Sequence, residues 1–210
     1  GFFRKSIKIN ETKKNKFIFF LVGFFLFFFP QVSNASSSST IFIEDITNRA
    51  SEVLSSDVTN EQKILKLREI GKNAVDIDGV GLYTLGKHRK TLSESQKTEY
   101  QKIFKEYFLK SFSGRLVNYK DAKIVVVSEE IKNEKYTIVY SKLLGTEDRP
   151  EVKINWRVYT KNPDKPLIRD LVIEGLSLAR TQKEEFNSII QNNNGDINAL
   201  FVSLKEFNEN

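Results

Sequence analysis

The residue types that most often carry chemistry are scarce in this chain and poorly grouped. The 210 residues include no cysteine and a single histidine, His88, in the polar run Gly86–Lys90. A Ser–His–Asp triad needs a histidine beside its nucleophile, and a multi-His metal site needs several. Asp76 and Asp78 are close enough to suggest a calcium loop, but no further oxygen ligands follow at the required spacing. We therefore interpret His88 as a solvated residue and the two aspartates as helix-capping residues.

The glycine-punctuated segment Asp76–Gly86 resembles a phosphate loop only superficially. It lacks the glycine spacing followed by Lys-Ser or Lys-Thr with which such loops hold phosphates, so a nucleotide-binding function is not supported. An enzymatic function stays open in one form only, a cavity with an isolated acidic base such as Asp170 or Glu174. The sequence predicts no catalytic residue, no metal and no cofactor.

The first 35 residues have the pattern of an export signal. Six Lys and Arg residues precede or border the apolar run Phe17–Phe29, and Pro30 and Ser33-Asn34-Ala35 follow it. As a helix, the run would rise about 20 Å, short of the ~30 Å hydrocarbon core of a bilayer. We expect residues 1–35 to be a signal peptide cleaved after Ala35, with an uncleaved signal anchor as the alternative. In both cases the rest of the chain is exported.

Removal of the signal peptide changes the charge of the chain. Residues 1–35 contain six of the 33 Lys and Arg residues and one of the 27 Asp and Glu residues, so residues 36–210 carry a net charge of about +1. A protein that neutralises nucleic-acid phosphates needs a basic face, which this balance does not support. We expect no nucleic-acid partner. We expect residues 36–210 to form a single domain whose core is stabilised by packing, because disulfides are absent.

Helical patterns dominate the first half of residues 36–210. Apolar residues three and four apart predict a helix over 43–54, and the capping box Thr59–Gln62 starts a second helix. Residues 76–86 indicate a turn into a brief helix, and a second capping box, Ser93–Gln96, starts the most clearly marked one. One face of that helix carries Tyr100, Ile103, Phe104, Tyr107, Phe108 and Phe112. We interpret most of these side chains as core and some as the lining of a pocket.

Alternating patterns dominate the second half and predict four strands. The strands cover Ala122–Glu130, Lys135–Leu143, Val152–Thr160 and Leu167–Glu174. Because the links between them are short and turn-like, we expect antiparallel pairing. Helices over Ala179–Gln191 and Asp196–Asn208 follow, and the fold class that we predict is α+β.

Within each predicted strand, alternate side chains share one face. The apolar positions on these faces include Ile138 and Tyr140, Trp156 and Val158, and Leu171 and Ile173. We expect them to form one apolar side of the sheet, covered by helices, with residues such as Lys153 and Arg157 on the other side.

Several segments, in order, resemble the MlaC family of periplasmic phospholipid-binding proteins, also called toluene-tolerance proteins. The segment Asp170–Leu178, DLVIEGLSL, with Lys183 and Phe186 after it, resembles the family pattern D-V-x-x-E-G-V-S-L … R-x-x-F. The segments Leu85–Lys90 and Leu92–Gln96 resemble its L-G-x-x-W/R … T/S-x-E-Q pattern. The aromatic helix, the strands and a closing helix follow in the family order, and the resemblance covers residues 40–207.

The resemblance implies a curved antiparallel sheet of four to five strands, covered by several helices that enclose an apolar cavity for the acyl chains of a diacyl phospholipid. It implies a carrier that shuttles lipid between an outer-membrane lipoprotein–porin complex and an inner-membrane ABC transporter with an MCE-domain subunit, in support of outer-membrane lipid asymmetry. The residues that we expect to bind lipid are Val80, Tyr83, Phe104, Phe108, Ile138, Tyr140, Trp156, Val158, Leu171 and Ile173. Two acyl tails need a volume near or above about 1,000 Å³.

Two other functions remain open on the sequence. An exported enzyme with a cavity, on a similar cone-shaped α+β fold, would need a buried carboxylate of raised pKa inside the cavity. An exported interaction module without a ligand would instead have a filled core. The surroundings of the acidic residues and the packing of the expected lining therefore separate the three functions.

Overall fold

The structure is a computed structural model that describes residues 37–210; the predicted signal peptide, residues 1–35, lies outside the described residues. The helices of the described part are α1 (Ser38–Ser55), α2 (Asn60–Ala74), α3 (Ile77–Leu85), the 3-10 helix η1 (Gly86–Lys90), α4 (Glu94–Leu116), α5 (Leu178–Asn192) and α6 (Ile197–Glu209). The strands are β1 (Ile124–Asn133), β2 (Tyr136–Leu143), β3 (Val152–Tyr159), β4 (Leu167–Ile173) and β5 (Leu176–Ser177). Within residues 37–210, no helix combines the length and the apolar character needed to cross a membrane.

The five strands form one sheet in the order β1-β2-β3-β4-β5, and each pair of neighbours is antiparallel. The four longer strands begin and end within three residues of the predicted positions. Both capping boxes are present at the predicted helix starts, at Thr59 and Ser93. The predicted α+β class and the antiparallel pairing are confirmed.

A two-residue turn joins β4 to β5 and explains the Glu-Gly pair of the sequence. Ile173 pairs with Leu176, and the two residues between them, Glu174 and Gly175, have φ values of 48° and 81°. Two consecutive positive φ values define a type I′ turn, whose twist matches that of the strands. The turn reverses the chain, and Ser177 then caps α5 by accepting a hydrogen bond from the Arg180 amide.

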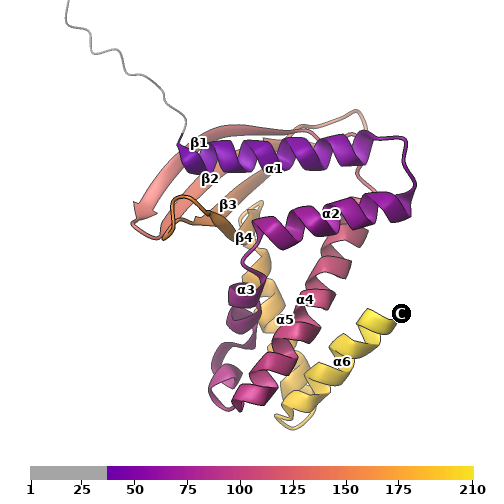
Figure 1. The fold of residues 1–210 in the computed structure, drawn as a ribbon, viewed down its shortest axis with the longest axis vertical. Helices are drawn as coiled ribbons and strands as arrows, with labels where there is room; N and C mark the ends of the chain where they lie inside the picture. The colour runs from indigo at the N-terminus through magenta and orange to yellow at the C-terminus, as the bar shows by residue number, and fades with distance from the viewer. Residues whose placement is uncertain (1–36) are drawn as a thin grey trace, which may run out of the picture. The chain divides into compact units, whose positions relative to one another are not determined.

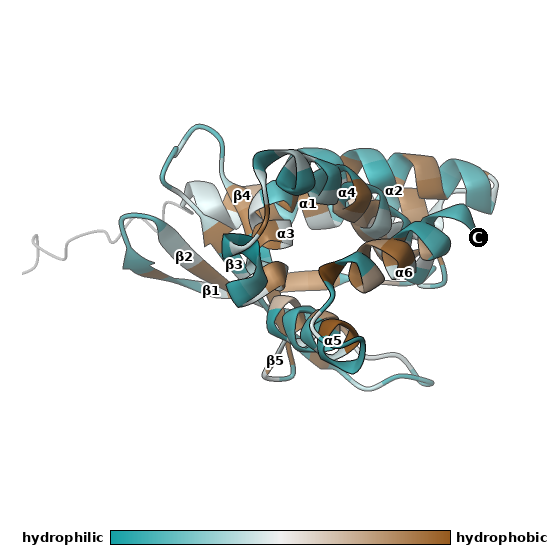
Figure 2. Cartoon of the chain, turned by 90° about the horizontal axis from the view of Figure 1, so that it is seen from below, coloured by the Kyte–Doolittle hydropathy of each residue, from teal (hydrophilic) through white to brown (hydrophobic). Residues whose placement is uncertain are grey.

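Apolar side chains gather in two places. One group, the sheet cluster, lies between α1, α2 and one face of the sheet: Ile43, Ile46, Ile70, Ala74, Val139, Ile154, Trp156, Val158 and Ile168. The other group, the helix cluster, joins α3, α4, α5 and α6: Ile77, Leu85, Leu92, Tyr100, Ile103, Phe104, Leu109, Phe186, Ile190, Leu200, Phe201 and Leu204. Figure 1 shows α1 lying across the strands and α3 to α6 gathered together, and in Figure 2 α5 and α6 carry both hydrophobic and hydrophilic segments.

The segment between α2 and α3 connects the two clusters. Val75 contacts both clusters and forms an isolated parallel bridge with Ile168 of β4. The next residue, Asp76, donates its amide to the Ile168 carbonyl at 3.0 Å and accepts a hydrogen bond from the Gly79 amide at 3.1 Å. Asp76 is thus the N-cap of α3, as predicted. Its second carboxylate oxygen pairs with Arg169 Nε at 2.8 Å.

We expect the type I′ turn to make Gly175 intolerant of a side chain. Gly175→Ala should lower the free energy of unfolding by about 1–2 kcal/mol, because a Cβ makes a backbone conformation with positive φ unfavourable. A Cβ at this position would meet no atom within 4 Å, so the whole cost would be conformational. Chemical denaturation measures it.

Gly114, in α4, is the matched control, since its added Cβ would also meet nothing within 4 Å. Gly114→Ala should stabilise the protein by up to about 1 kcal/mol. Equal effects of the two substitutions would contradict the assigned turn.

Candidate functional site

Three of the expected lipid-binding residues lie in or against the helix cluster. Phe104 is 2% exposed, and its ring lies 5.7 Å from that of Tyr100 and 6.3 Å from that of Phe186. Phe108 lies 6.2 Å from Phe104, and Val80 of α3 packs against the same group. A Cβ on Gly81 would lie 2.7 Å from Phe104 Cδ1, so α3 and α4 approach closely at this glycine. The aromatic face predicted for α4 is therefore a contact surface for α3 and α5.

The polar groups buried in the helix cluster are neutral hydroxyls with partners. The Tyr100 and Thr84 hydroxyls lie 2.8 Å apart, and Thr84 also donates to the Gly81 carbonyl. Tyr107 donates to Gln182 Oε1 at 3.0 Å. Burial raises the pKa of the hydroxyls of both tyrosines above the ordinary value. These hydroxyls stay protonated at neutral pH, so they add no charge to the cluster.

Four more of the expected residues share the face of the sheet that α1 and α2 cover. Trp156 pairs with Leu171, and Val158 pairs with Ile168. Val158 is fully buried and Trp156 is 8% exposed, while Leu171 and Ile173 are partly buried against the sheet cluster. The indole N–H of Trp156 donates to Ser141 Oγ at 2.8 Å, and Ser141 donates to the Ile154 carbonyl. The only polar atom of the tryptophan is thus satisfied within the cluster.

Ile138 and Tyr140 do not join this face, and the expectation that they would is wrong. In the β2–β3 register Val139 pairs with Trp156, whereas Ile138 pairs with Arg157 and Tyr140 with Asn155. Because side chains alternate along a strand, Ile138 and Tyr140 point to the opposite side of the sheet from Trp156. There the Tyr140 hydroxyl donates to Glu130 Oε2 at 2.6 Å.

The composition of β2 explains this error. The residues of β2 on the covered face are Thr137, Val139 and Ser141, of which the most exposed, Thr137, is 5% exposed. Two of these three residues carry hydroxyl groups. The other face of β2 carries Tyr136, Ile138 and Tyr140, which have larger side chains, so the sequence favoured that face as the covered one. The buried Ser141 hydroxyl is tolerated because it is hydrogen-bonded on both sides.

Tyr83, the last of the expected residues, lies at the surface. It is 41% exposed, and the Lys183 ammonium lies 5.2 Å from the centre of its ring. Val80, one helical turn earlier, packs against the helix cluster. Tyr83 therefore stands at the margin of that cluster and is not part of its interior.

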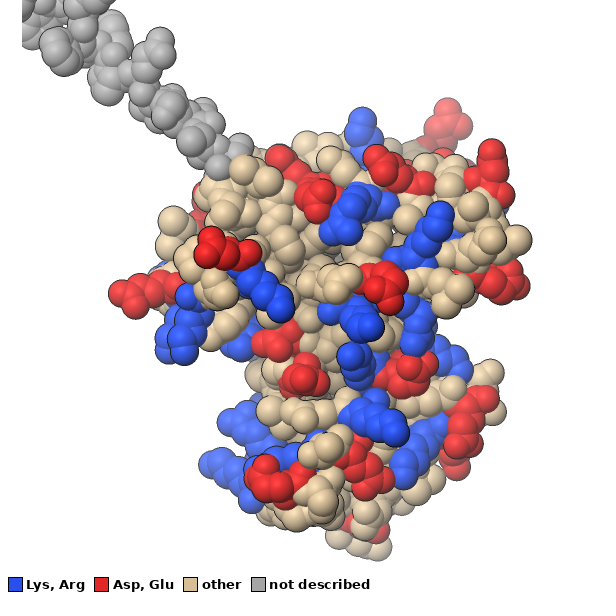
Figure 3. Space-filling view, viewed as in Figure 1, with Lys and Arg blue, Asp and Glu red and all other residues tan. Residues whose placement is uncertain are grey.

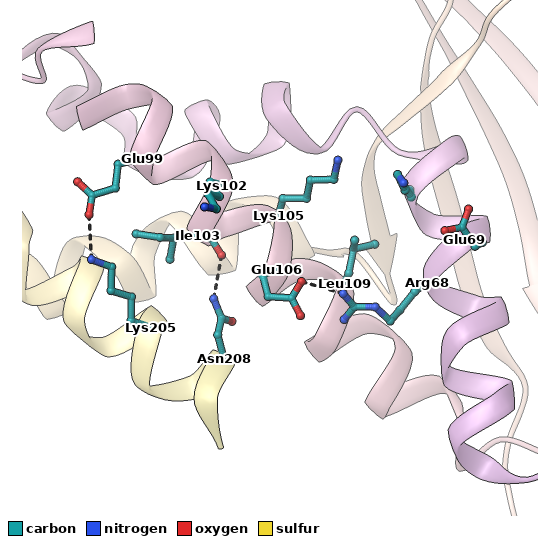
Figure 4. Close-up of a pocket in the computed structure, with 11 residues that line it drawn as sticks. Arg68, Glu69, Glu99, Lys102, Ile103, Lys105, Glu106, Leu109, Lys205 and Asn208 are labelled. Atoms are coloured by element: carbon teal, nitrogen blue, oxygen red, sulfur yellow. Dashed lines mark hydrogen bonds and ion pairs between the residues drawn. The ribbon is translucent and has the colours of Figure 1, made fainter. Parts of the chain in front are cut away.

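Two hollows at the surface are lined mainly by polar residues. A charged groove of about 700 Å³ between α2, α4 and α6 is lined by Arg68, Glu69, Lys72, Glu99, Lys102, Ile103, Lys105, Glu106, Leu109, Lys205 and Asn208 (Figure 4). A basic hollow of about 390 Å³ is lined by Tyr83, Gly86, Lys87, Arg89, Lys90 and Lys183. Of the ten expected lipid-binding residues, only Tyr83 borders either hollow. An apolar cavity lined by the others stays a prediction.

The acidic residues considered as catalytic bases have structural partners. Asp170 accepts hydrogen bonds from the amides of Leu171 at 2.8 Å and Ala179 at 3.0 Å and from the Ser177 hydroxyl. It therefore holds the start of α5. Glu174 is exposed and accepts a hydrogen bond from the Lys153 amide. His88, expected to be solvated, is partly covered, with Nε2 2.9 Å from Asn187 Oδ1.

The potential metal-ligating side chains of the described residues are not clustered. Within residues 37–210, no group of three or more His, Cys, Asp or Glu side chains is arranged to hold an ion. The observed roles of Asp76 and Asp170 are those of helix caps, at the starts of α3 and α5.

The two faces of the sheet should respond differently to truncation. Val158→Ala should lower the free energy of unfolding by about 1–3 kcal/mol, because it leaves a void in the sheet cluster. Ile138→Ala, on the adjacent strand but the opposite face, should cost less than about 1 kcal/mol. Urea denaturation of both variants measures the difference. A larger loss in Ile138→Ala than in Val158→Ala would contradict the observed register.

Comparison with known proteins identifies the family. The family model described as "MlaC protein" matches residues 44–206. No curated protein matches the chain. Among solved structures, a phospholipid-binding protein from Ralstonia solanacearum, determined in complex with a phospholipid, superposes with a TM-score of 0.67 at 18% identity, over 80% of this chain and 96% of that one. At that identity the likeness shows a shared fold, whereas the family match spans most of the sequence. The chain belongs to the MlaC family.

Proposed function

We propose that this protein is a periplasmic carrier that binds a diacyl phospholipid and moves it between the outer and the inner membrane. The observation that carries the proposal is the family match over residues 44–206. The fold shared with a protein that was solved with a phospholipid supports it. We infer no catalytic role, since family members are lipid carriers and the acidic residues considered as bases serve as structural partners.

The acyl chains, on this proposal, lie along the seam between the sheet cluster and the helix cluster. Phe104, Phe108 and Val80 form one wall. Trp156, Val158, Leu171 and Ile173 form the other. The two walls meet at Val75, which contacts both. The expected lining, apart from Ile138, Tyr140 and Tyr83, thus belongs to the two apolar clusters that Val75 contacts.

A seam of this kind suits a protein that must both bind and release its cargo. An acyl chain inserted there replaces contacts between apolar side chains by contacts with its own methylene groups. Hydrophobic free energy scales with the apolar area removed from water, at about 25 cal/mol per Å². The apolar side chains are shielded from water both with and without lipid, so the exchange changes their water-exposed area little. Such a carrier avoids the very tight binding that would prevent delivery.

The family is the basis on which we propose the location and the partners of this protein. The MlaC family is periplasmic. We propose that residues 1–35 direct export and are removed after Ala35, which leaves residues 36–210 as a single lipid-carrier domain. The proposed partners are an outer-membrane lipoprotein–porin complex and an inner-membrane ABC transporter with an MCE-domain subunit, and the proposed role is maintenance of outer-membrane lipid asymmetry.

Lipid that accompanies the purified protein is the first test. We expect the chain, expressed with residues 1–35 and isolated from the periplasm, to yield about one diacyl phospholipid per protein on organic extraction and mass spectrometry. N-terminal sequencing of the same sample should begin at Ser36. A folded protein without any lipid would favour the ligand-free interaction module.

The position of the acyl chains can be tested with the single tryptophan of the chain. Trp156 lies on the proposed wall, so phospholipid with brominated acyl chains should quench its fluorescence strongly relative to unbrominated lipid, since bromine quenches an indole that it touches.

A relocated tryptophan provides the control. In the double variant Trp156→Phe, Tyr140→Trp the indole lies on the opposite face of the sheet. Its emission should change little with the same lipid. Equal quenching of the two proteins would place the acyl chains elsewhere.

A further inference from the structure

The basic hollow differs from its surroundings in charge. Four of its six lining residues are Lys or Arg, and none is acidic. Since residues 36–210 carry a net charge of about +1, four cations around one hollow are a marked local excess. In Figure 3, several Lys and Arg side chains lie on the part of the molecule that carries α3 and η1, with Asp and Glu side chains nearby.

The cations of the basic hollow are not neutralised within the described residues. None of Lys87, Arg89, Lys90 and Lys183 lies within 4.0 Å of a carboxylate in residues 37–210. The charged groove offers the contrast. It also contains cations, but three glutamates line it, and Arg68–Glu106 and Lys205–Glu99 pair at 2.8 Å (Figure 4). Five Lys or Arg and three Glu line the charged groove, an excess of two positive charges, whereas the basic hollow has four cations and no carboxylate.

Two contacts hold Lys183 in the basic hollow. Its ammonium lies over the ring of Tyr83, at 5.2 Å from the centroid, and its stem crosses Gly86. A Cβ on Gly86, where φ is 55°, would lie 2.8 Å from Lys183 Cε, so the stem occupies the space of the missing side chain. Lys183 thereby joins α5 to the closely spaced cations of η1.

We propose that the basic hollow binds a phosphate group, supplied either by the headgroup of a lipid or by a free phosphate ion. A volume of about 390 Å³ lies within the range of small-ligand sites. Lys and Arg donors form charge-assisted hydrogen bonds to phosphate oxygens. The lipid source rests on the proposed carrier function. It is consistent with the position of Tyr83 at the margin of the helix cluster, one turn from Val80.

Headgroup selectivity tests the lipid source. We would load the protein from vesicles of equal phosphatidylglycerol and phosphatidylethanolamine and measure the extracted ratio by mass spectrometry. The wild type should favour phosphatidylglycerol, because the ammonium of phosphatidylethanolamine is repelled by four cations. Lys183→Gln and Arg89→Gln should each lower the ratio about threefold. High salt should lower the wild-type ratio as well.

Lys102→Gln is the matched control. It removes the same charge from the charged groove and should leave the lipid ratio unchanged. All three substituted side chains lie at or near the surface, so circular dichroism and thermal melts should show intact folding.

A titration with sodium phosphate tests the second source. In ¹H–¹⁵N NMR spectra, phosphate should shift the Gly86 amide of the wild type and not that of Lys183→Gln. Such a shift with an unchanged lipid ratio assigns the site to free phosphate. A dependence of the lipid ratio on Lys183 assigns it to a headgroup. The absence of both effects overturns the proposed site. Uptake of no lipid at all, with the phosphate shift retained, contradicts the carrier function and leaves the site standing.

Discussion

The ion pair between Asp76 and Arg169 fixes the junction on which the arrangement of the two apolar clusters depends. Asp76 ends the α2–α3 link, caps α3 and pairs with a β4 side chain, so one residue orients a helix against a strand. The Arg169 guanidinium is held on both sides. It donates to the Tyr136 hydroxyl at 2.5 Å and lies 3.6 Å from the centre of the Tyr159 ring. Because Arg169 also contacts two tyrosines, its position beside Asp76 is fixed more firmly than in an isolated ion pair at the surface.

The junction lies where the two apolar clusters meet. The sheet cluster is closed by α1 and α2, which precede Asp76, whereas the helix cluster is built from α3 to α6, which follow it. Val75 and Ile168 bring the edges of the clusters together beside the ion pair. The proposed lipid seam therefore ends at a link held by an ion pair, a backbone hydrogen bond and a β-bridge.

The sequence predicted the fold well because most of the signals involved are local. Thr59 and Ser93 satisfy the first turns of their own helices, and alternation within seven to ten residues marks each long strand. The Glu174-Gly175 turn is also local, although its type follows only from the observed φ values. Each of these features depends on interactions within a few residues of the chain.

The lining of the site was harder to predict because it depends on pairing between distant residues. Which face of β2 is covered is decided by its register against β3, and no apolar pattern in β2 reveals that Thr137 and Ser141 lie inside. The sequence favours an inward position for Tyr83 on its short helix, yet Tyr83 contacts Lys183 of α5, which is distant in the chain. The assignment of Lys183 to a hollow with η1 likewise required the tertiary structure.

The order of the strands has a consequence for how the chain folds after export. Every ladder joins strands that are adjacent in sequence, so the sheet is built from contacts of low sequence separation, which form quickly. α1, by contrast, packs against strands that follow it much later in the chain: Ser51 donates to the Ala122 carbonyl across 71 residues, and Thr40 to Glu129 across 89. A chain that emerges N-terminus first therefore presents the apolar face of α1, with Ile43 and Ile46, long before β1 and β2 exist to cover it. In that interval, without disulfides to limit misassembly, the protein is most exposed to aggregation and to periplasmic proteases.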